Sequence, residues 1–379
     1  MMPGRERAGL SLYTRNLTRR LRAAGVEVDL VGYATGREDR AALEAECGGP
    51  VDLLETPRRV AVDLTDQARA VLSERVAAAD LVHLHGMRTR LNVFAAAAAR
   101  RARTPLLVSP HGQVHPWQMA QHRWRKRVLD LFADRRIYRR AAGVVAVSEE
   151  EAGHVRAFAP RTPVTVIPPG VEPVQARDAA APPGLGGGGG RTLLYLADLS
   201  RRKGVDLLAD AWLRAAPAGC RLVLAGRATE FGEEDVRGWV DAAPAASPIV
   251  RAGPVSDAEK AALFSEADGF VMPSRAEAFG IVVAEALSAG VPCIATRATP
   301  WSCLADSGAG WHVDTSAAGL AAGIAAWAAA DDLPARGAAA EGLYRGRFSP
   351  EAETSAYLRV YGNLLDAPLL PHVAARAGR

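Results

Sequence analysis

The sequence predicts an α/β fold with two doubly wound domains, and three features of the chain lead to this prediction. Its 379 residues are too many for one ordinary domain and suit two of middling size. Apolar, β-rich runs alternate with stretches of helical periodicity almost throughout, as in parallel sheets that helices cover on both faces. A Pro- and Gly-rich segment, residues 176–190, can continue neither a helix nor a strand.

That segment contains LGGGGG and is predicted to be a flexible linker. We therefore expect a first domain at residues 1–175, the linker at 176–190, a second domain at 191–348 and a closing helix at 349–379. Ligands of doubly wound sheets bind at the carboxyl ends of the strands, so we expect the functional residues to lie there.

Strands and helices can be assigned to each half in turn. In the first half the predicted strands are 26–31, 81–84, 105–109, 144–147 and 164–167, and the predicted helices are 10–24, 65–78, 91–101, 122–140 and 149–158. In the second half the predicted strands are 192–197, 221–225, 249–252, 269–272, 292–295 and 311–313, and a helix follows each of the first four.

The beginning of the chain departs from this pattern. A domain of this kind opens with a strand, but a helical pattern is already under way near Gly9. We therefore expect the first domain to lack its first strand, which is a central strand of the sheet. Either that strand is absent or it belongs to a segment upstream of Met1.

Composition narrows the class of protein further. The net charge of +4 is too small to indicate a nucleic-acid partner. The four cysteines are scattered with no C-x-x-C pair, so neither a zinc site nor a disulfide framework is predicted. No run approaches the roughly 18 to 20 apolar residues that span a bilayer, and the first residues lack the apolar core of a signal peptide. We expect a cytoplasmic protein that is at most peripheral to a membrane.

One predicted helix has a marked basic character. Residues 121–140 contain eight Lys or Arg against two Asp, with apolar residues such as Trp124 and Phe132 at helical spacing. A basic amphipathic helix can lie on anionic lipid at the inner face of a membrane. The alternative is a helix of the first domain whose apolar stripe faces the sheet and whose arginines are solvated.

The segment 273–296, PSRAEAFGIVVAEALSAGVPCIAT, contains the most informative motif. It follows an apolar strand, turns, and is predicted to begin a helix near Gly280 that ends at Gly290, a natural C-terminal cap. Glu277 lies just before the helix and Glu285 lies eight residues later. Eight helical residues rise about 12 Å, roughly the distance from the sugar to the ribose of a nucleotide sugar.

The start of that helix also suits an anion. The amides of Phe279, Gly280 and Ile281 lack partners within the helix, so they can bind a diphosphate with the help of the helix dipole. One helix can then contact the sugar through Glu277, the diphosphate through the amides and the ribose through Glu285. Two glutamates eight residues apart are weak evidence alone, but the strand, the Phe-Gly turn and the Gly cap around them strengthen the interpretation.

These residues match the E-x7-E pattern, and the chain resembles the large retaining glycosyltransferase family 4. Members of that family have the GT-B fold, in which two Rossmann-like domains face a cleft. The resemblance extends to DLVHLHG at 80–86, VSPHG at 108–112, VIPPGVE at 166–172 and AGPVSDAEKAALFSEAD at 252–268. It covers nearly the whole chain and is strongest to bacterial enzymes that build cell-surface polysaccharides.

The resemblance implies a function and a set of site residues. It implies transfer of a hexosyl-type sugar, with retention, from a nucleoside-diphosphate sugar to a glycan or lipid-linked acceptor. No cofactor and no obligatory metal are implied. Glu277 and His111 are the implied catalytic residues at the donor sugar, and Lys203 is the implied partner of the diphosphate. The last helix is implied to cross back onto the first domain.

The chain departs from the family pattern at two places. Asp198 stands where the family usually has an Arg that binds the diphosphate, and Arg202 or Arg201 is the candidate replacement. The alternative is that both arginines are solvated. The N-terminal Gly-Gly loop of the family is reduced to Ala8–Gly9. These departures motivate a second hypothesis, a non-catalytic relative that binds nucleotide sugars or acts as a scaffold.

Two further histidines lie on a predicted strand of the first domain. His83 and His85 are two residues apart, and we expect one of them to face the core. A structural role is favoured over substrate contact for this pair.

Overall fold

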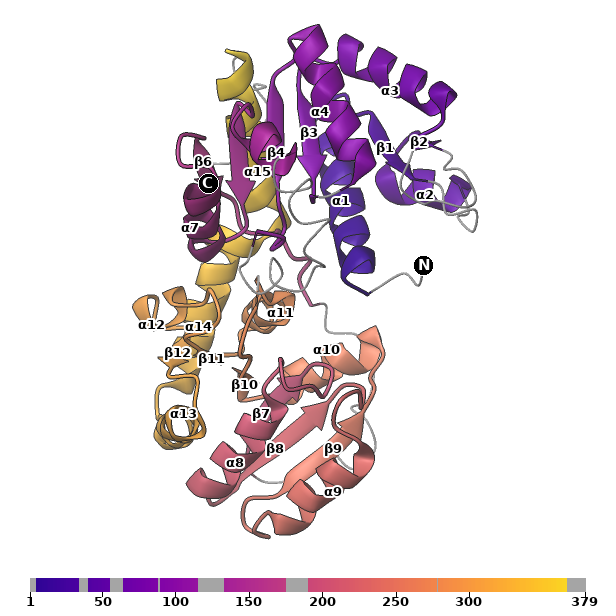
Figure 1. Cartoon of the computed structure of the whole chain (residues 1–379). Coiled ribbons are helices and arrows are strands. Elements are labelled where there is room, and N and C mark those ends of the chain that lie inside the picture. Colours follow the sequence, from indigo (N-terminus) through magenta and orange to yellow (C-terminus); the bar gives the residue numbers. More distant parts are fainter. Residues whose placement is uncertain are drawn as a thin grey trace. The chain divides into compact units, whose positions relative to one another are not determined.

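The computed structural model describes residues 5–33, 40–54, 64–87, 89–114, 133–174, 190–277 and 279–366. The chain divides into two compact units, one formed by Met1–Pro169 with Pro350–Arg379 and the other by Gly170–Ser349. Each unit is an α/β structure with parallel strands and flanking helices (Figure 1). The predicted linker, apart from Gly190, and the first part of the basic segment at 121–140 lie outside the described residues.

The first unit combines the N-terminal part of the chain with its last described helix. Its elements are α1 (Arg5–Ala23), β1 (Leu30–Tyr33), α2 (Arg40–Cys47), β2 (Val51–Leu54), α3 (Asp66–Ala78), β3 (Val82–His85), α4 (Arg90–Ala102), β4 (Leu106–Ser109), β5 (Gly143–Ala146), α7 (Glu149–Phe158), β6 (Val164–Val166) and α15 (Pro350–Leu365).

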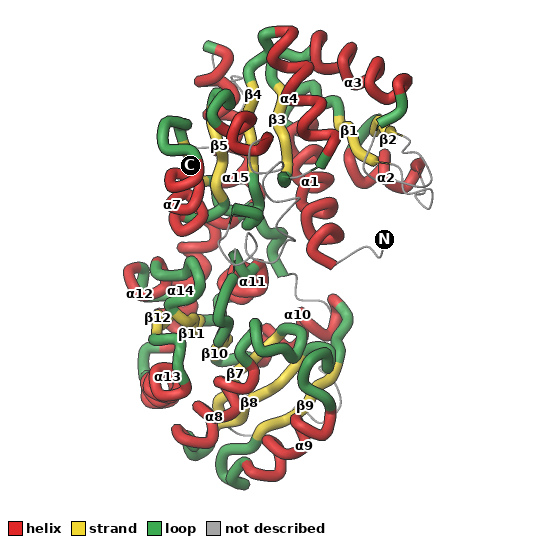
Figure 2. The backbone as a smooth tube through the Cα atoms, viewed as in Figure 1, coloured by secondary structure: helices red, strands yellow, loops and turns green. Residues whose placement is uncertain are grey.

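The strands of the first unit form two separate parallel sheets. One has the order β3-β4-β5-β6, and the other contains only β1 and β2. Among the described residues no strand precedes α1 and none joins β1 to β3. The described strands of this unit thus form a divided sheet. Figure 2 shows the strands of both units in yellow with helices around them.

Three predictions for the first unit need correction. The sequence missed α2 and β2, because runs of eight and four residues give too little periodicity to read. The first strand begins at Leu30, and Val26 and Val28 lie in the loop before it, packed against a buried cluster that includes Leu17 and Leu107. Gly9 lies inside α1, not in a loop before it, because the helix already begins at Arg5. Good helix formers precede this glycine and offset its cost of about 1 kcal/mol.

The second unit is built on one larger sheet. Its elements are β7 (Arg191–Leu196), α8 (Val205–Ala215), β8 (Cys220–Ala225), α9 (Glu233–Ala242), β9 (Ile249–Gly253), α10 (Asp257–Glu266), β10 (Gly269–Met272), α11 (Ile281–Ser288), β11 (Cys293–Thr296), α12 (Cys303–Asp306), β12 (Gly310–Val313), α13 (Ala317–Ala329), α14 (Leu333–Leu343) and the π-helix Tyr344–Phe348.

This sheet positions the loops of the candidate site. Its strand order is β12-β11-β10-β7-β8-β9, and every pair of neighbours is parallel. The order reverses between β7 and β10, which is where ligands of doubly wound sheets bind. The carboxyl ends of β10, β7 and β8 thus bring three loops to one edge. Among the described residues, none of the helices has the length and apolar character needed to cross a membrane.

Candidate active site

The loop after β10 presents Glu277. Two contacts hold this loop: the hydroxyl of Thr296 donates to the carbonyl of Ser274 (2.5 Å), and Arg275 forms a two-pronged ion pair with Asp206 (2.7 and 2.8 Å). The side chain of Glu277 is only 7% exposed. A carboxylate that is so deeply covered requires cationic partners to remain charged.

Those partners come from the loop after β7. Lys203 Nζ donates to Glu277 Oε1 (2.5 Å) and to Oε2 (3.2 Å). Arg202 Nη1 donates to the same two oxygens at 3.2 and 3.3 Å. The structure therefore joins Glu277 to two predicted site residues, Arg202 and Lys203, that lie more than seventy positions away in sequence. An anionic ligand can therefore bind Lys203 and Arg202 in exchange for the carboxylate of Glu277.

Two glycines allow these loops to approach. Gly204 has a φ of 72°, and a Cβ there would lie 2.0 Å from the carbonyl oxygen of Pro273. Gly280 has a φ of 86°, and a Cβ there would lie 2.4 Å from Cε of Met272. A side chain at Gly204 would force the Lys203 loop away from Pro273, and one at Gly280 would displace the end of Met272 and strain the left-handed backbone.

The helix of the E-x7-E motif begins next to Gly280, as predicted. Gly280 adopts a left-handed conformation as the N-cap, so α11 starts at Ile281. About half of the interval from Glu277 to Glu285 is therefore loop, and the predicted rise of about 12 Å over eight helical residues is wrong. The amides at the N-terminus of α11 still lack partners within the helix.

Glu285 lies within α11 and has a lysine partner from the neighbouring helix. Lys260 Nζ on α10 donates to Glu285 Oε1 at 2.7 Å. The side chains of Glu285 and Lys260 are 15% and 23% exposed, so the pair is partly buried. Lys260 was not predicted from the sequence. It lies in the first turn of α10, a helix whose N-terminus is capped, and this position fixes its backbone.

The structure distinguishes the two arginines considered at the phosphate position. Arg202 points to Glu277, whereas the guanidinium of Arg201 lies over the ring of Phe231, 5.4 Å from its centroid. Asp198 pairs with Arg227, whose Nε is 3.2 Å from Oδ1. Asp198, which stands where the family usually has an arginine, is thus paired with a cation that was not predicted from the sequence.

In the first unit, His111 lies in the turn after β4. Its φ of 51° is in the left-handed region, which a residue other than glycine rarely adopts. The buried carboxylate of Glu151 holds this turn, because it accepts from the amide of Gly112 and from the amide of Val147 (2.8 Å). Strain that the surrounding structure maintains is typical of functional sites.

A second histidine contacts His111 directly. His85 Nδ1 lies 2.9 Å from His111 Nε2. Burial lowers the pKa of His85 to about 4, and burial together with the charge of His85 lowers the pKa of His111 well below its usual value. Both imidazoles are therefore neutral at pH 7, and one ring N–H donates to the other ring.

His83 and His85 lie on the same face of β3, and His83 packs against the buried ring of Tyr357. The ring centroids of the two histidines are 4.1 Å apart, because residues i and i+2 of a strand lie on the same face. His83 Nδ1 lies 2.8 Å from the hydroxyl of Tyr361, and its Nε2 lies 2.8 Å from that of Ser109. His83 is thus a structural link between β3, β4 and α15, as favoured above.

Sequence reasoning also missed the aromatic residue beside His111. The ring of Tyr13 on α1 meets that of His111 edge-on, with centroids 4.7 Å apart. The Tyr13 hydroxyl donates to Glu353 Oε1 on α15 at 2.7 Å. These positions are 340 residues apart, so no local signal could have joined them.

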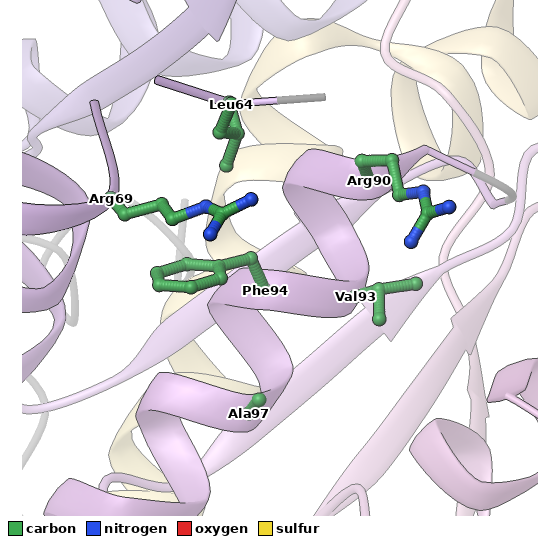
Figure 3. Close-up of a pocket in the computed structure, with 6 residues that line it drawn as sticks. All are labelled: Leu64, Arg69, Arg90, Val93, Phe94 and Ala97. Atoms are coloured by element: carbon green, nitrogen blue, oxygen red, sulfur yellow. The ribbon is translucent and has the colours of Figure 1, made fainter. Parts of the chain in front are cut away.

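A separate cavity of about 150 Å³ lies beside α3 and α4 (Figure 3). The residues that line it are Leu64, Arg69, Arg90, Val93, Phe94 and Ala97. None of the predicted site residues is among them. Within the described part of the chain, no group of three or more His, Cys, Asp or Glu is arranged to hold a metal ion.

Comparison with known proteins connects both units to glycosyl transfer. Residues 8–170 match the family model of the glycosyl transferase 4-like domain, and residues 190–329 match that of the glycosyl transferases group 1. The GDP-mannose:cellobiosyl-diphosphopolyprenol alpha-mannosyltransferase of Xanthomonas campestris is 30% identical over 62% of this chain and 60% of its own length. The chain therefore spans less than two thirds of that relative.

Other relatives are matched over more of their length. The D-inositol 3-phosphate glycosyltransferase of Segniliparus rotundus is 27% identical over 98% of this chain and 88% of its own. Among solved structures, Anabaena HepE in complex with UDP is 19% identical, with a TM-score of 0.73 over 96% of this chain and 97% of that one. Sucrose-phosphate synthase of Thermosynechococcus elongatus is 21% identical, with a TM-score of 0.65 over 94% and 93%.

The two parallel α/β units and these likenesses define a glycosyltransferase of the GT-B fold. Together the two family models cover most of the chain. The chain thus combines a glycosyl transferase 4-like domain with a glycosyl transferases group 1 domain, which is consistent with the family 4 resemblance of its E-x7-E motif.

Proposed function

We propose that this glycosyltransferase moves a hexosyl-type sugar, with retention of configuration, from a nucleoside-diphosphate sugar to a glycan or lipid-linked acceptor. The observation that carries the proposal is the contact of Lys203 and Arg202 with the covered carboxylate of Glu277, next to the N-terminus of α11. Two named relatives support the choice of substrates. One uses GDP-mannose with a diphosphopolyprenol-linked acceptor, and HepE was solved with UDP-glucose.

The cations have a defined part in this mechanism. The donor diphosphate takes the place of Glu277 as the partner of Lys203 and Arg202, and the amides of Gly280 and Ile281 bind the same anion. The charge on the leaving diphosphate grows as the glycosidic bond breaks. Lysine, arginine and helix amides that are already in position stabilise the transition state more than the ground state.

The carboxylates and the histidine act on the sugar and the ribose. Once Lys203 binds phosphate, Glu277 is released to accept hydrogen bonds from sugar hydroxyls near the reacting carbon. Glu285 accepts a hydrogen bond from the ribose, with Lys260 holding its carboxylate. His111 of the first unit acts on a sugar as a neutral ring, since its lowered pKa excludes a positive charge at pH 7.

A calorimetric titration with UDP-, GDP- and ADP-sugars tests the proposal. We expect at least one donor to bind, and a labelled sugar to pass from it to a polyprenyl-diphosphate glycan extract. Lys203→Ala should weaken that binding by about 10- to 100-fold, because it removes a charge-assisted contact to phosphate. Failure of every nucleotide sugar to bind contradicts the proposal, and binding without any transfer favours a non-catalytic relative.

We also propose that the first unit contacts anionic lipid through its basic surface. In the described part of segment 121–140, Arg136 and Arg140 are exposed, and Arg100 at the end of α4 is near them. Repulsion from Arg136, then burial and repulsion from Arg100, lower the pKa of Arg140. Charges that are crowded in this way gain from a nearby anionic surface.

Sedimentation with vesicles tests this contact. The double variant Arg136→Gln, Arg140→Gln should bind phosphatidylglycerol vesicles roughly tenfold more weakly, since each basic residue near the surface strengthens adsorption. Phosphatidylcholine vesicles provide the comparison, and Arg214→Gln in the second unit provides a control variant. Equal binding of the double variant and the unmodified protein contradicts the membrane contact.

A further inference from the structure

Asp198 and Arg227 lie opposite each other at the ends of neighbouring strands. In the register of β7 and β8, Leu196 is opposite Ala225. The strands continue side by side beyond this point, because the amide of Leu199 donates to the carbonyl of Arg227 at 2.8 Å. Side chains at positions 198 and 227 therefore leave the same edge of the sheet, and their ion pair joins the two loops.

A glycine makes this close approach possible. Gly226 has a φ of 127°, and a Cβ there would lie 1.9 Å from the carbonyl oxygen of Ala197. The following residues are also tied to the β7 loop, since the hydroxyl of Thr229 donates to the carbonyl of Leu199 at 2.8 Å. The backbone on both sides of Arg227 is thus fixed, and its guanidinium is directed across the strand end.

The cation lies on a different strand from the one that the family pattern predicts. The pattern has a cation at position 198, and this chain has an acid there with the cation on the next strand. We propose that Arg227 is a second diphosphate-binding cation of the donor site, which acts together with Lys203 and in place of an arginine at position 198. This inference rests on the proposed function and assigns one of its binding residues.

The strand order supports the position of Arg227. Glu277 follows β10, Lys203 follows β7 and Arg227 follows β8. These three strands lie side by side in the sheet in that order. Adjacent strands lie about 4.8 Å apart, so Arg227 is one strand from the Lys203 loop, on the side away from Glu277. A diphosphate that binds at Lys203 would therefore have Arg227 on the side of β8.

Tyr195 links the two acids in the same region. Its hydroxyl donates to the carbonyl of Asp198 at 3.1 Å. Burial raises the pKa of Tyr195, and the charges of Asp198 and Glu277 raise it further. Both carboxylates are thus within electrostatic range of one hydroxyl at the end of β7.

The ion pair of Arg227 can also exchange partners at little cost. The side chains of Arg227 and Asp198 are 48% and 36% exposed, and an exposed pair of this kind is weakly held. A phosphate offers the planar guanidinium a two-pronged contact. Two other arginines of this unit have different partners. Arg201 lies over Phe231, and Arg251 is held by Glu233 and by the carbonyl of Leu224.

A double-mutant cycle separates phosphate binding by Arg227 from simple neutralisation of Asp198. Arg227→Gln, Asp198→Asn and the double variant are titrated with UDP and GDP by calorimetry. We expect Arg227→Gln to weaken binding by about 10- to 100-fold in both backgrounds, because the lost contact is to phosphate. If the double variant binds as tightly as the unmodified protein, Arg227 only neutralises Asp198 and the inference is overturned.

Two controls identify the source of a failure. The variants Asp210→Asn and Arg214→Gln remove a comparable exposed ion pair on α8, and they should leave nucleotide binding unchanged. Lys203→Ala is measured alongside. If Lys203→Ala weakens nucleotide binding and Arg227→Gln does not, the proposed function stands and the role of Arg227 is wrong. If the unmodified protein binds neither nucleotide, the proposed function itself fails.

Discussion

Replacing Glu277 with glutamine is expected to lower the rate of sugar transfer by about 100- to 1,000-fold, a loss typical when a group that stabilises the transition state is removed. Glutamine keeps the shape of the side chain but lacks the charge that holds sugar hydroxyls near the reacting carbon. Nucleotide binding should persist or become tighter, because Lys203 and Arg202 then lose the carboxylate that competes with phosphate.

Single-turnover transfer and calorimetric binding of the nucleotide measure the two halves of this result. Glu233→Gln is a suitable control, since Glu233 is exposed on α9 and pairs with Arg251. A Glu277→Gln enzyme that keeps most of its rate removes Glu277 from the catalytic role. Loss of both transfer and nucleotide binding points instead to a collapsed loop, which the melting temperature detects.

Replacing Glu353 with alanine is expected to destabilise the first unit by about 3 to 5 kcal/mol, the usual cost of removing one partner of a buried ion pair. The carboxylate of Glu353 is fully covered and accepts from Arg20 and from Tyr13 of α1. Without it, the Arg20 guanidinium, whose side chain is 12% exposed, loses a charged partner.

Urea unfolding can follow the first unit separately, because a chain with two units need not unfold in one step. The first unit's transition should move to lower urea while that of the second unit is unchanged. Glu351→Ala, an exposed acid two residues earlier on α15, is the matched control. Identical unfolding curves for Glu353→Ala and the unmodified protein contradict a role for α15 in holding α1. Transfer should also decline, because Tyr13 contacts His111.

The alternation of strands and helices could be predicted because it depends on local periodicity. Long, buried runs such as β7 and β8 have a clear pattern, and the predicted boundaries differ from the observed ones by only a residue or so. The strand–turn–helix of the E-x7-E motif is also contiguous in sequence. Short elements such as α2 and β2 give no comparable signal, since packing and not periodicity decides whether they form.

By itself, the sequence determined the α/β class, the family and the identity of Glu277, Glu285 and Lys203 as candidate residues. Only the tertiary structure decided which of them meet. The strand order brings Lys203 beside Glu277 and Arg227 beside Asp198, and α15 brings Glu353 to Tyr13. Sheet order and crossover packing depend on contacts between residues far apart in the chain, which a local pattern cannot encode.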